Sequence, residues 1–74
     1  MYQYYVIEIQ KYRDGTYGHL VHYVYDSDET TAFLKGESKY YQILAAAAVS
    51  DLPQHSAILI DTKGNPIYHK CYEH

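Results

Sequence analysis

The chain has 74 residues, 47% of them hydrophobic, and a net charge of −3. This length supports one small domain with a small core, and the hydrophobic share excludes a disordered chain. The acidic balance and the scattered Lys and Arg residues disfavour capture of nucleic acid or of an anionic membrane by charge.

No run of about 18 apolar residues occurs, so we expect no transmembrane span. The first residues lack the basic start and apolar run of a signal peptide, and we expect none. The single cysteine excludes an internal disulfide and fits a reducing compartment. Eleven tyrosines accompany one phenylalanine and no tryptophan, and tyrosine suits surfaces that are half packed and half exposed.

Residues 2–12 predict a first strand, because they alternate and are rich in β-branched and aromatic side chains. One face of this strand carries Tyr5, Ile7 and Ile9, and the other carries Tyr4, Val6, Glu8 and Gln10. Asp14 and Gly15 are a hairpin turn signal, and residues 19–25 predict the second strand. Together these segments predict a first hairpin.

Acidic residues after this hairpin predict the start of a helix. Asp26, Asp28 and Glu29 lie together, Ser27 or Asp28 can cap the helix, and the carboxylates favour its N-terminal dipole. Residues 30–36 allow two interpretations, either the first part of the helix or a loop or short separate turn. The glycine that ends this segment costs about 1 kcal/mol relative to alanine inside a helix.

Residues 37–53 predict the main helix. Its apolar side chains recur at helical spacing, at Tyr40, Ile43, Leu44 and Ala47. The Asp-Leu-Pro sequence at the end of this block stops the helix, so we expect it to end near Ser50. Four consecutive alanines, residues 45–48, fit either tight packing on a sheet or a helix contacted on two sides in an oligomer.

Residues 57–60 are wholly apolar and predict a short strand. Residues 61–66 carry Gly and Pro and predict a turn, and residues 67–72 predict the last strand. The element order is β-β-α-β-β, and we expect residues 1–74 to form a single ββαββ domain. The predicted fold class is α+β, with one helix packed on one face of a four-stranded, mainly antiparallel sheet.

One helix covers one face of such a sheet, and both faces carry apolar groups. In the preferred register the helix covers Tyr5, Ile7, Ile9, Leu20, Val24, Ile58, Ile60 and Ile67. The uncovered face then carries Tyr4, Val6, Val21, Tyr23, Tyr25, Leu59, Tyr68 and Tyr72. This second set is too apolar for a solvated face, and such patches mark interfaces. We therefore predict that these residues form the interface of a homo-oligomer, a dimer.

The possible metal ligands cluster near the C-terminal end, at His69, Cys71 and His74. On a strand His69 and Cys71 share a face while His74 points the other way. His22 could lie on the same sheet face as the first two, but a closed structural zinc site needs four ligands. We predict no metal and no cofactor, and interpret Cys71 as a small buried residue beside two partly exposed histidines.

Catalytic and nucleic-acid signals are weaker. Cys71 with His69 or His22 as base would be a nucleophile, but no oxyanion loop or third orienting group follows. No phosphate loop, dinucleotide fingerprint or serine elbow is present, so we predict that the protein is not an enzyme. A tyrosine-rich sheet can stack RNA bases, but the acidic total outweighs the basic residues Lys11, Arg13, Lys63 and Lys70.

Three segments carry a resemblance to a known family: residues 37–53 (ESKYYQILAAAAVSDLP), His55 with residues 57–61 (AILID), and residues 69–74 (HKCYEH). From residue 5 onward the chain resembles small uncharacterised proteins encoded by phages and prophages of gut clostridia, often beside late structural genes. Residues 30–36 form a longer segment here than in that family. The resemblance implies a non-enzymatic virion or late-expressed accessory protein, located in the virion or the host bacterial cytoplasm, and it implies no site residues.

These observations leave three classes of function. The first is a small phage-derived structural or interaction protein that self-associates through a Tyr-rich sheet face, an Ala-rich helix, or both. The second is a small inhibitor that binds a host protein through the same aromatic surface. The third is a nucleic-acid- or metal-binding accessory protein. We favour the first, because the uncovered apolar face requires a partner.

Overall fold

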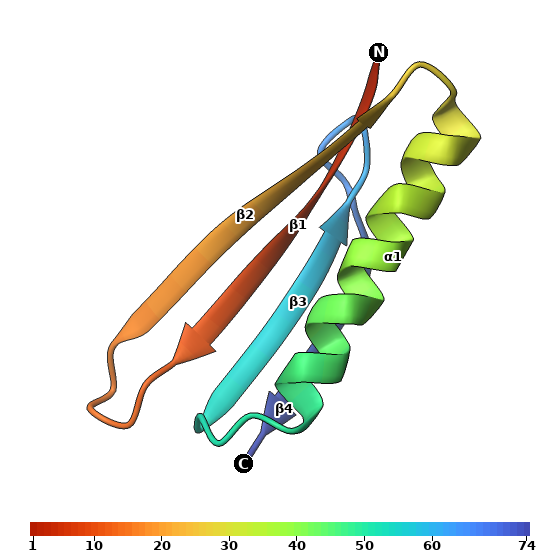
Figure 1. The fold of residues 1–74 in the computed structure, drawn as a ribbon. Helices are drawn as coiled ribbons and strands as arrows, with labels where there is room; N and C mark the ends of the chain where they lie inside the picture. The colour runs from red at the N-terminus through yellow and green to blue at the C-terminus, as the bar shows by residue number, and fades with distance from the viewer.

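The computed structural model describes residues 1–74 and contains one sheet and one helix (Figure 1). The elements in chain order are β1 (Tyr2–Lys11), β2 (Tyr17–Asp26), α1 (Glu29–Ala48), β3 (Gln54–Ile60) and β4 (Pro66–Glu73). The strands lie in the order β2-β1-β3-β4, and every neighbouring pair is antiparallel. The predicted α+β class and ββαββ order are confirmed.

The two hairpins meet at the centre of the sheet, where β1 pairs with β3. This central ladder extends from Tyr5 opposite Ile60 to Lys11 opposite Gln54. α1 connects the edge strand β2 to β3 and packs on one side of the sheet (Figure 1). The result is a two-layer slab with extents of 41 × 19 × 14 Å, in which one sheet face has no covering layer.

Each hairpin turns through a glycine with a positive φ angle. Gly15 has a φ of +89° and Gly64 a φ of +85°, a region that glycine adopts without the steric cost of a Cβ. The second turn is also closed by Asp61, whose carboxylate accepts a 2.8 Å hydrogen bond from the Asn65 N–H. Both hairpin turns therefore form where the sequence predicts them.

α1 continues without a break through residues 30–36, so the helical interpretation of this segment is correct. Asp28 is the N-cap, and its carboxylate accepts 2.8 Å hydrogen bonds from the N–H and the hydroxyl of Thr31. Asp26 accepts from the Asp28 N–H at 2.9 Å. The acidic cluster is therefore a capping device. The helix ends at Ala48, close to its predicted end.

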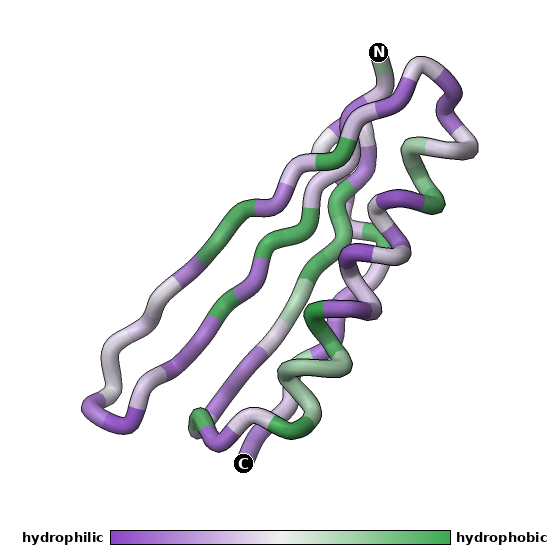
Figure 2. Tube along the Cα trace, in the orientation of Figure 1, coloured by the Kyte–Doolittle hydropathy of each residue, from purple (hydrophilic) through white to green (hydrophobic).

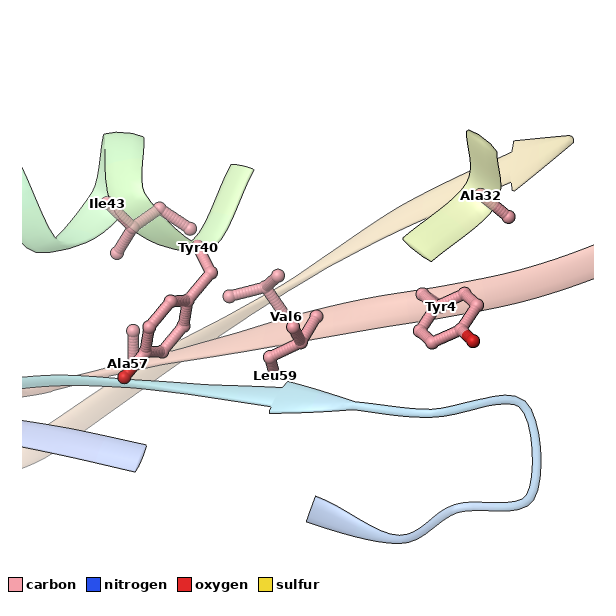
Figure 3. Packing of buried hydrophobic residues seen from close by; sticks show 7 residues of the cluster. All are labelled: Tyr4, Val6, Ala32, Tyr40, Ile43, Ala57 and Leu59. Carbon is pink, nitrogen blue, oxygen red and sulfur yellow. The ribbon is translucent and has the colours of Figure 1, made fainter. Parts of the chain in front are cut away.

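The core lies between α1 and the two central strands. The helix stripe that faces the sheet consists of Ala32, Gly36, Tyr40, Ile43 and Ala47. The buried strand residues beneath it are Tyr4, Val6, Ala57 and Leu59. Figure 3 shows the helix side chains and the strand side chains meeting in the space between the two layers. Only nine hydrophobic residues are buried, so the core is small even for a chain of this length.

Gly36 sets the distance between α1 and the sheet. A Cβ at this position would lie 3.0 Å from Leu59 Cδ1 and 3.2 Å from Tyr4 Cβ, closer than the optimal separation of carbon atoms. The residue that weakens the helix locally therefore allows the helix backbone to rest directly on β1 and β3. The free energy that glycine costs the helix relative to alanine is offset by this close packing.

The predicted face assignment is wrong for three of the four strands. Tyr4, Val6 and Leu59, predicted on the uncovered face, are buried beneath α1, and Tyr68 and Tyr72 also lie on the helix side. The residues predicted beneath the helix that lie on the uncovered face instead are Tyr5, Ile7, Ile9, Ile58, Ile60 and Ile67. The assignment is correct for β2, which places Leu20 and Val24 on the helix side and Val21, Tyr23 and Tyr25 on the uncovered side.

The error has a physical cause in the composition of β1. Both of its faces are apolar, so burial of hydrophobic surface does not by itself select one of them. The selection comes from fit to the helix, whose Gly36 admits the side chains of Tyr4 and Leu59 at close range. Glu8 shares the face of Tyr4 and also finds polar partners on that side.

We expect Gly36→Ala to destabilise the protein, although alanine is the better helix former by about 1 kcal/mol. Overpacking costs about 1–3 kcal/mol. Leu59 cannot yield because it is fully buried, and the Cβ of Tyr4 is fixed to the backbone of β1. The expected net loss in the free energy of unfolding is about 1 kcal/mol, measured by urea denaturation.

The control for this experiment is Ser38→Ala, at an exposed position of α1. This variant should keep or slightly raise the stability, because alanine favours the helix and meets no neighbour. A Gly36→Ala protein more stable than the wild type would show that α1 does not rest on β1 and β3 as described.

Candidate functional site

The uncovered face of the sheet, here called the open face, is built from alternate residues of the strands. Its apolar side chains are Tyr5, Ile7 and Ile9 of β1, Val21, Tyr23 and Tyr25 of β2, Ile58 and Ile60 of β3, and Ile67 of β4, of which only Ile60 is buried. Figure 2 shows hydrophobic positions along β1 and β2 and in the second half of β3. Ile7 lies between Val21 and Ile58 in neighbouring strands, so the side chains form a continuous patch.

The open face is packed only by its own side chains. Tyr23 is 55% exposed and Tyr25 48% exposed, and their rings stack with centroids 6.5 Å apart. Tyr5 lies against Tyr23 at 5.9 Å. Ile7 and Ile58 are half-buried, although α1 packs on the opposite face. A contiguous apolar patch of this kind is typical of a protein–protein contact surface.

Three predicted interface residues, Val21, Tyr23 and Tyr25, lie on the open face. The other five lie on the helix side, where burial removes Tyr4, Val6 and Leu59 from any surface. The open face as an interface stays a prediction, with a corrected set of residues.

The Ala-rich end of α1 is only partly packed. Ala47 is fully buried against the sheet, whereas Ala45, Ala46 and Ala48 are exposed. Tight packing on the sheet therefore explains one alanine of the run, and the other three are free of contact with the sheet. The alternative of a helix contacted on two sides stays a prediction.

A polar network on the helix side of the sheet was missed by the sequence analysis. The Glu8 carboxylate contacts His55 Nε2 at 2.6 Å and His22 Nε2 at 3.2 Å. Gln10 donates to the same carboxylate at 3.1 Å and accepts from the Tyr12 hydroxyl at 2.9 Å. The register explains this meeting, because Glu8 and Gln10 share a face of β1 and Gln10 lies directly opposite His55.

The sequence held a signal for this network. Glu8 is a carboxylate on the same face as Tyr4 and Val6, and such a residue needs polar partners when it is buried. The predicted third strand begins at residue 57, which places His55 outside the predicted sheet. β3 begins at Gln54, which brings His55 into it.

The Glu8 side chain is only 12% exposed, and that of His55 only 7%. Burial by itself raises the pKa of the Glu8 carboxyl, but the hydrogen bonds with His55, His22 and Gln10 outweigh burial and hold this pKa below its ordinary value. The fold therefore favours the charged form of Glu8. His55 Nδ1, on the far side of the ring, is buried without a hydrogen-bond partner, which costs free energy.

The network does not have the arrangement of a metal site. His55 contacts one carboxylate oxygen and His22 contacts the other, so the ligand atoms do not converge on one point as a metal requires. No group of three or more His, Cys, Asp or Glu side chains could hold a metal ion.

The histidines and the cysteine near the C-terminal end are not brought together. His69 and Cys71 share the open-face side of β4, and His74 lies on the other side, where its Nε2 is 3.0 Å from the Ala47 carbonyl oxygen. The expectation that His22 shares the face of Cys71 is wrong, because His22 lies on the helix side. Cys71 is exposed, not buried.

Comparison with protein-family models, with curated proteins and with solved structures finds no match to this chain. No helix of the protein combines the length and the apolar character needed to span a membrane. The resemblance to phage and prophage proteins accordingly stays a hypothesis.

We expect the Glu8 network to stabilise the protein at neutral pH and to lose this effect in acid. Because the pKa of Glu8 is lower in the folded chain than in the unfolded chain, the contribution is present above the unfolded value and disappears as pH falls through the folded value. Glu8→Gln should therefore be less stable at neutral pH and lose less stability on acidification. Thermal unfolding across this pH range measures both effects.

Asp51→Asn is the control for this experiment, because the Asp51 side chain is 87% exposed. Its pH dependence of stability should match that of the wild type. A Glu8→Gln protein whose stability falls with pH as steeply as that of the wild type would contradict the role given to the network.

Proposed function

We propose that this protein is a small, non-enzymatic interaction module that self-associates into a homodimer through the open face. The observation that carries the proposal is a continuous apolar sheet face with no covering layer. The small core supports it, because a chain with so few buried hydrophobic residues gains much of its stability from any further burial.

The open face has the area of a specific dimer interface. Four strands about 4.8 Å apart, each of about eight residues at about 3.3 Å per residue, give a flat footprint of about 500 Å² per copy. Two copies together bury about 1,000 Å² or more, the size at which specific interfaces begin. The apolar part of this area lies mainly on β1, β2 and β3, and its burial stabilises the dimer by about 25 cal/mol per Å² before the cost of association.

The open face is also compatible with a second copy of itself. Two twisted sheets pack face to face at about 10 Å, which leaves α1 of each copy on the outside. The acidic and basic residues lie in one end row, where Lys11, Gln54 and Glu73 occupy neighbouring strands. Because this row carries one positive and one negative side chain, it meets the same row of a second copy without net repulsion.

A phage- or prophage-derived structural or interaction role is supported by the resemblance of residues 37–53 to such proteins. The functional partner in this proposal is a second copy of the chain.

We expect Tyr23→Glu to convert the dimer to a monomer, because it buries an unpaired charge in the interface. Tyr41→Glu is the matched control, since Tyr41 is also 55% exposed but lies on α1, outside the open face. Sedimentation equilibrium at micromolar concentration should give the monomer mass for Tyr23→Glu. The wild type and Tyr41→Glu should give the dimer mass.

Circular dichroism of each variant separates loss of the dimer from loss of the fold. A wild-type chain that stays monomeric at submillimolar concentration would exclude the proposed function. A folded Tyr23→Glu protein that remains dimeric would exclude the open face as its interface.

A further inference from the structure

An open groove lies between α1 and the edge strand β4. Its volume is about 440 Å³, within the range of ligand-binding clefts. Tyr40, Tyr41 and Leu44 of α1 form one wall, and residues 67–70 with Tyr72 of β4 form the other. The rings of Tyr40, Tyr41 and Tyr68 pack on one another with centroids 5.3–6.3 Å apart, which gives the groove an aromatic wall.

The groove follows a strand edge whose peptide groups have no partner. β4 pairs only with β3. The His74 N–H donates to the Pro53 carbonyl at 2.9 Å, and hydrogen-bonded pairs alternate along an antiparallel ladder. Tyr72 and Lys70 therefore direct their peptide groups toward β3. The peptide groups of Cys71 and His69 point out of the sheet, beside the groove.

We propose that this groove binds an extended peptide segment of a partner protein, which pairs with the free edge of β4 as a fifth strand. A strand added there lies about 4.8 Å from β4 and turns every second side chain toward the helix side. Those side chains enter the space in front of Tyr40, Tyr41 and Leu44. Backbone pairing then supplies affinity and the aromatic wall supplies selectivity, as in other cases of strand addition.

The walls of the groove define the chemistry of the peptide. Tyrosine rings and Leu44 favour aliphatic or aromatic side chains at alternate positions. Lys70 lies on the rim with its Nζ 5.3 Å from the Tyr72 ring centroid and no carboxylate partner, so an acidic residue fits there. At the other end Glu37 accepts a 2.9 Å hydrogen bond from the Tyr68 hydroxyl, which disfavours a second acidic residue.

The other free edge of the sheet, on β2, does not offer the same site. Lys35 of α1 already occupies it, with Nζ 3.2 Å from the Tyr25 carbonyl oxygen and 2.9 Å from the Asp26 carboxylate. No groove lies beside β2. A peptide on that edge would therefore gain backbone pairing without an aromatic wall, which makes β2 the natural control.

The test uses a display library of random dodecapeptides panned against the immobilised full chain. The most enriched peptide is synthesised with a fluorescent label, and its binding is followed by fluorescence anisotropy. Enriched sequences should alternate apolar with other residues and carry an acidic residue. Amide resonances that shift on binding should belong to β4 and to the part of α1 around Tyr41, not to the open face.

Two variants test the edge and the wall separately. His69→Pro removes an outward N–H of β4 and should weaken binding about tenfold or more. His19→Pro is its matched control, because the 2.8 Å bond from the Tyr12 N–H to the Thr16 carbonyl places the His19 peptide group on the free edge of β2. This control should bind as the wild type does. Tyr41→Glu changes only the wall and should also weaken binding about tenfold.

Several outcomes would overturn the proposal. One is a library that enriches no peptide above a blank surface, and another is a peptide that binds Tyr41→Glu as tightly as the wild type. If circular dichroism shows that His69→Pro does not fold, the binding measured for Tyr41→Glu decides whether the groove is the peptide site. Tyr23→Glu should bind the peptide normally, since the groove lies apart from the open face. A peptide that loses binding only in Tyr23→Glu would belong to the open face and would refute the groove.

Discussion

The contact between α1 and the paired strands β1 and β3 is the constraint on which the rest of the structure depends. At Gly36 the missing Cβ allows the helix backbone to approach Leu59 and Tyr4. Because one helix covers one face only, this contact decides which side chains form the core and which form the open face. The position of α1 also leaves β4 at the margin of the helix, where the aromatic groove lies.

The order of elements could be predicted because each element has a local signature. The turn glycines Gly15 and Gly64, the Asp28 cap and the helical spacing of apolar residues all depend on neighbours close in sequence. The sheet faces could not be predicted in the same way. Alternation separates Val6 from Ile7, but with both sets apolar it does not say which set lies inside. That choice depends on a helix contact distant in sequence.

The Glu8 network could not be predicted from the sequence for the same reason, because its contacts join residues distant in sequence. Its partners His22 and His55 come from β2 and β3, and only the pairing of both strands with β1 brings them to one carboxylate. A slip of β1 by one residue would move Glu8 to the open face and Ile7 beneath the helix. The network and the Gly36 contact therefore favour the same register. The network favours it because the buried Glu8 carboxylate then has hydrogen-bond partners, and the Gly36 contact favours it through close packing of the helix on the sheet.

The central ladder has a consequence for how the chain folds. Each hairpin and the helix form from contacts that are local in sequence, whereas β1 and β3 join the first part of the chain to the last, with Tyr5 opposite Ile60. Such non-local pairing is slow because loop-closure entropy is lost before the contact is gained. An isolated two-stranded hairpin is only marginally stable in water, so neither hairpin is expected to persist before β1 pairs with β3, and the fold forms as a whole through this one non-local ladder.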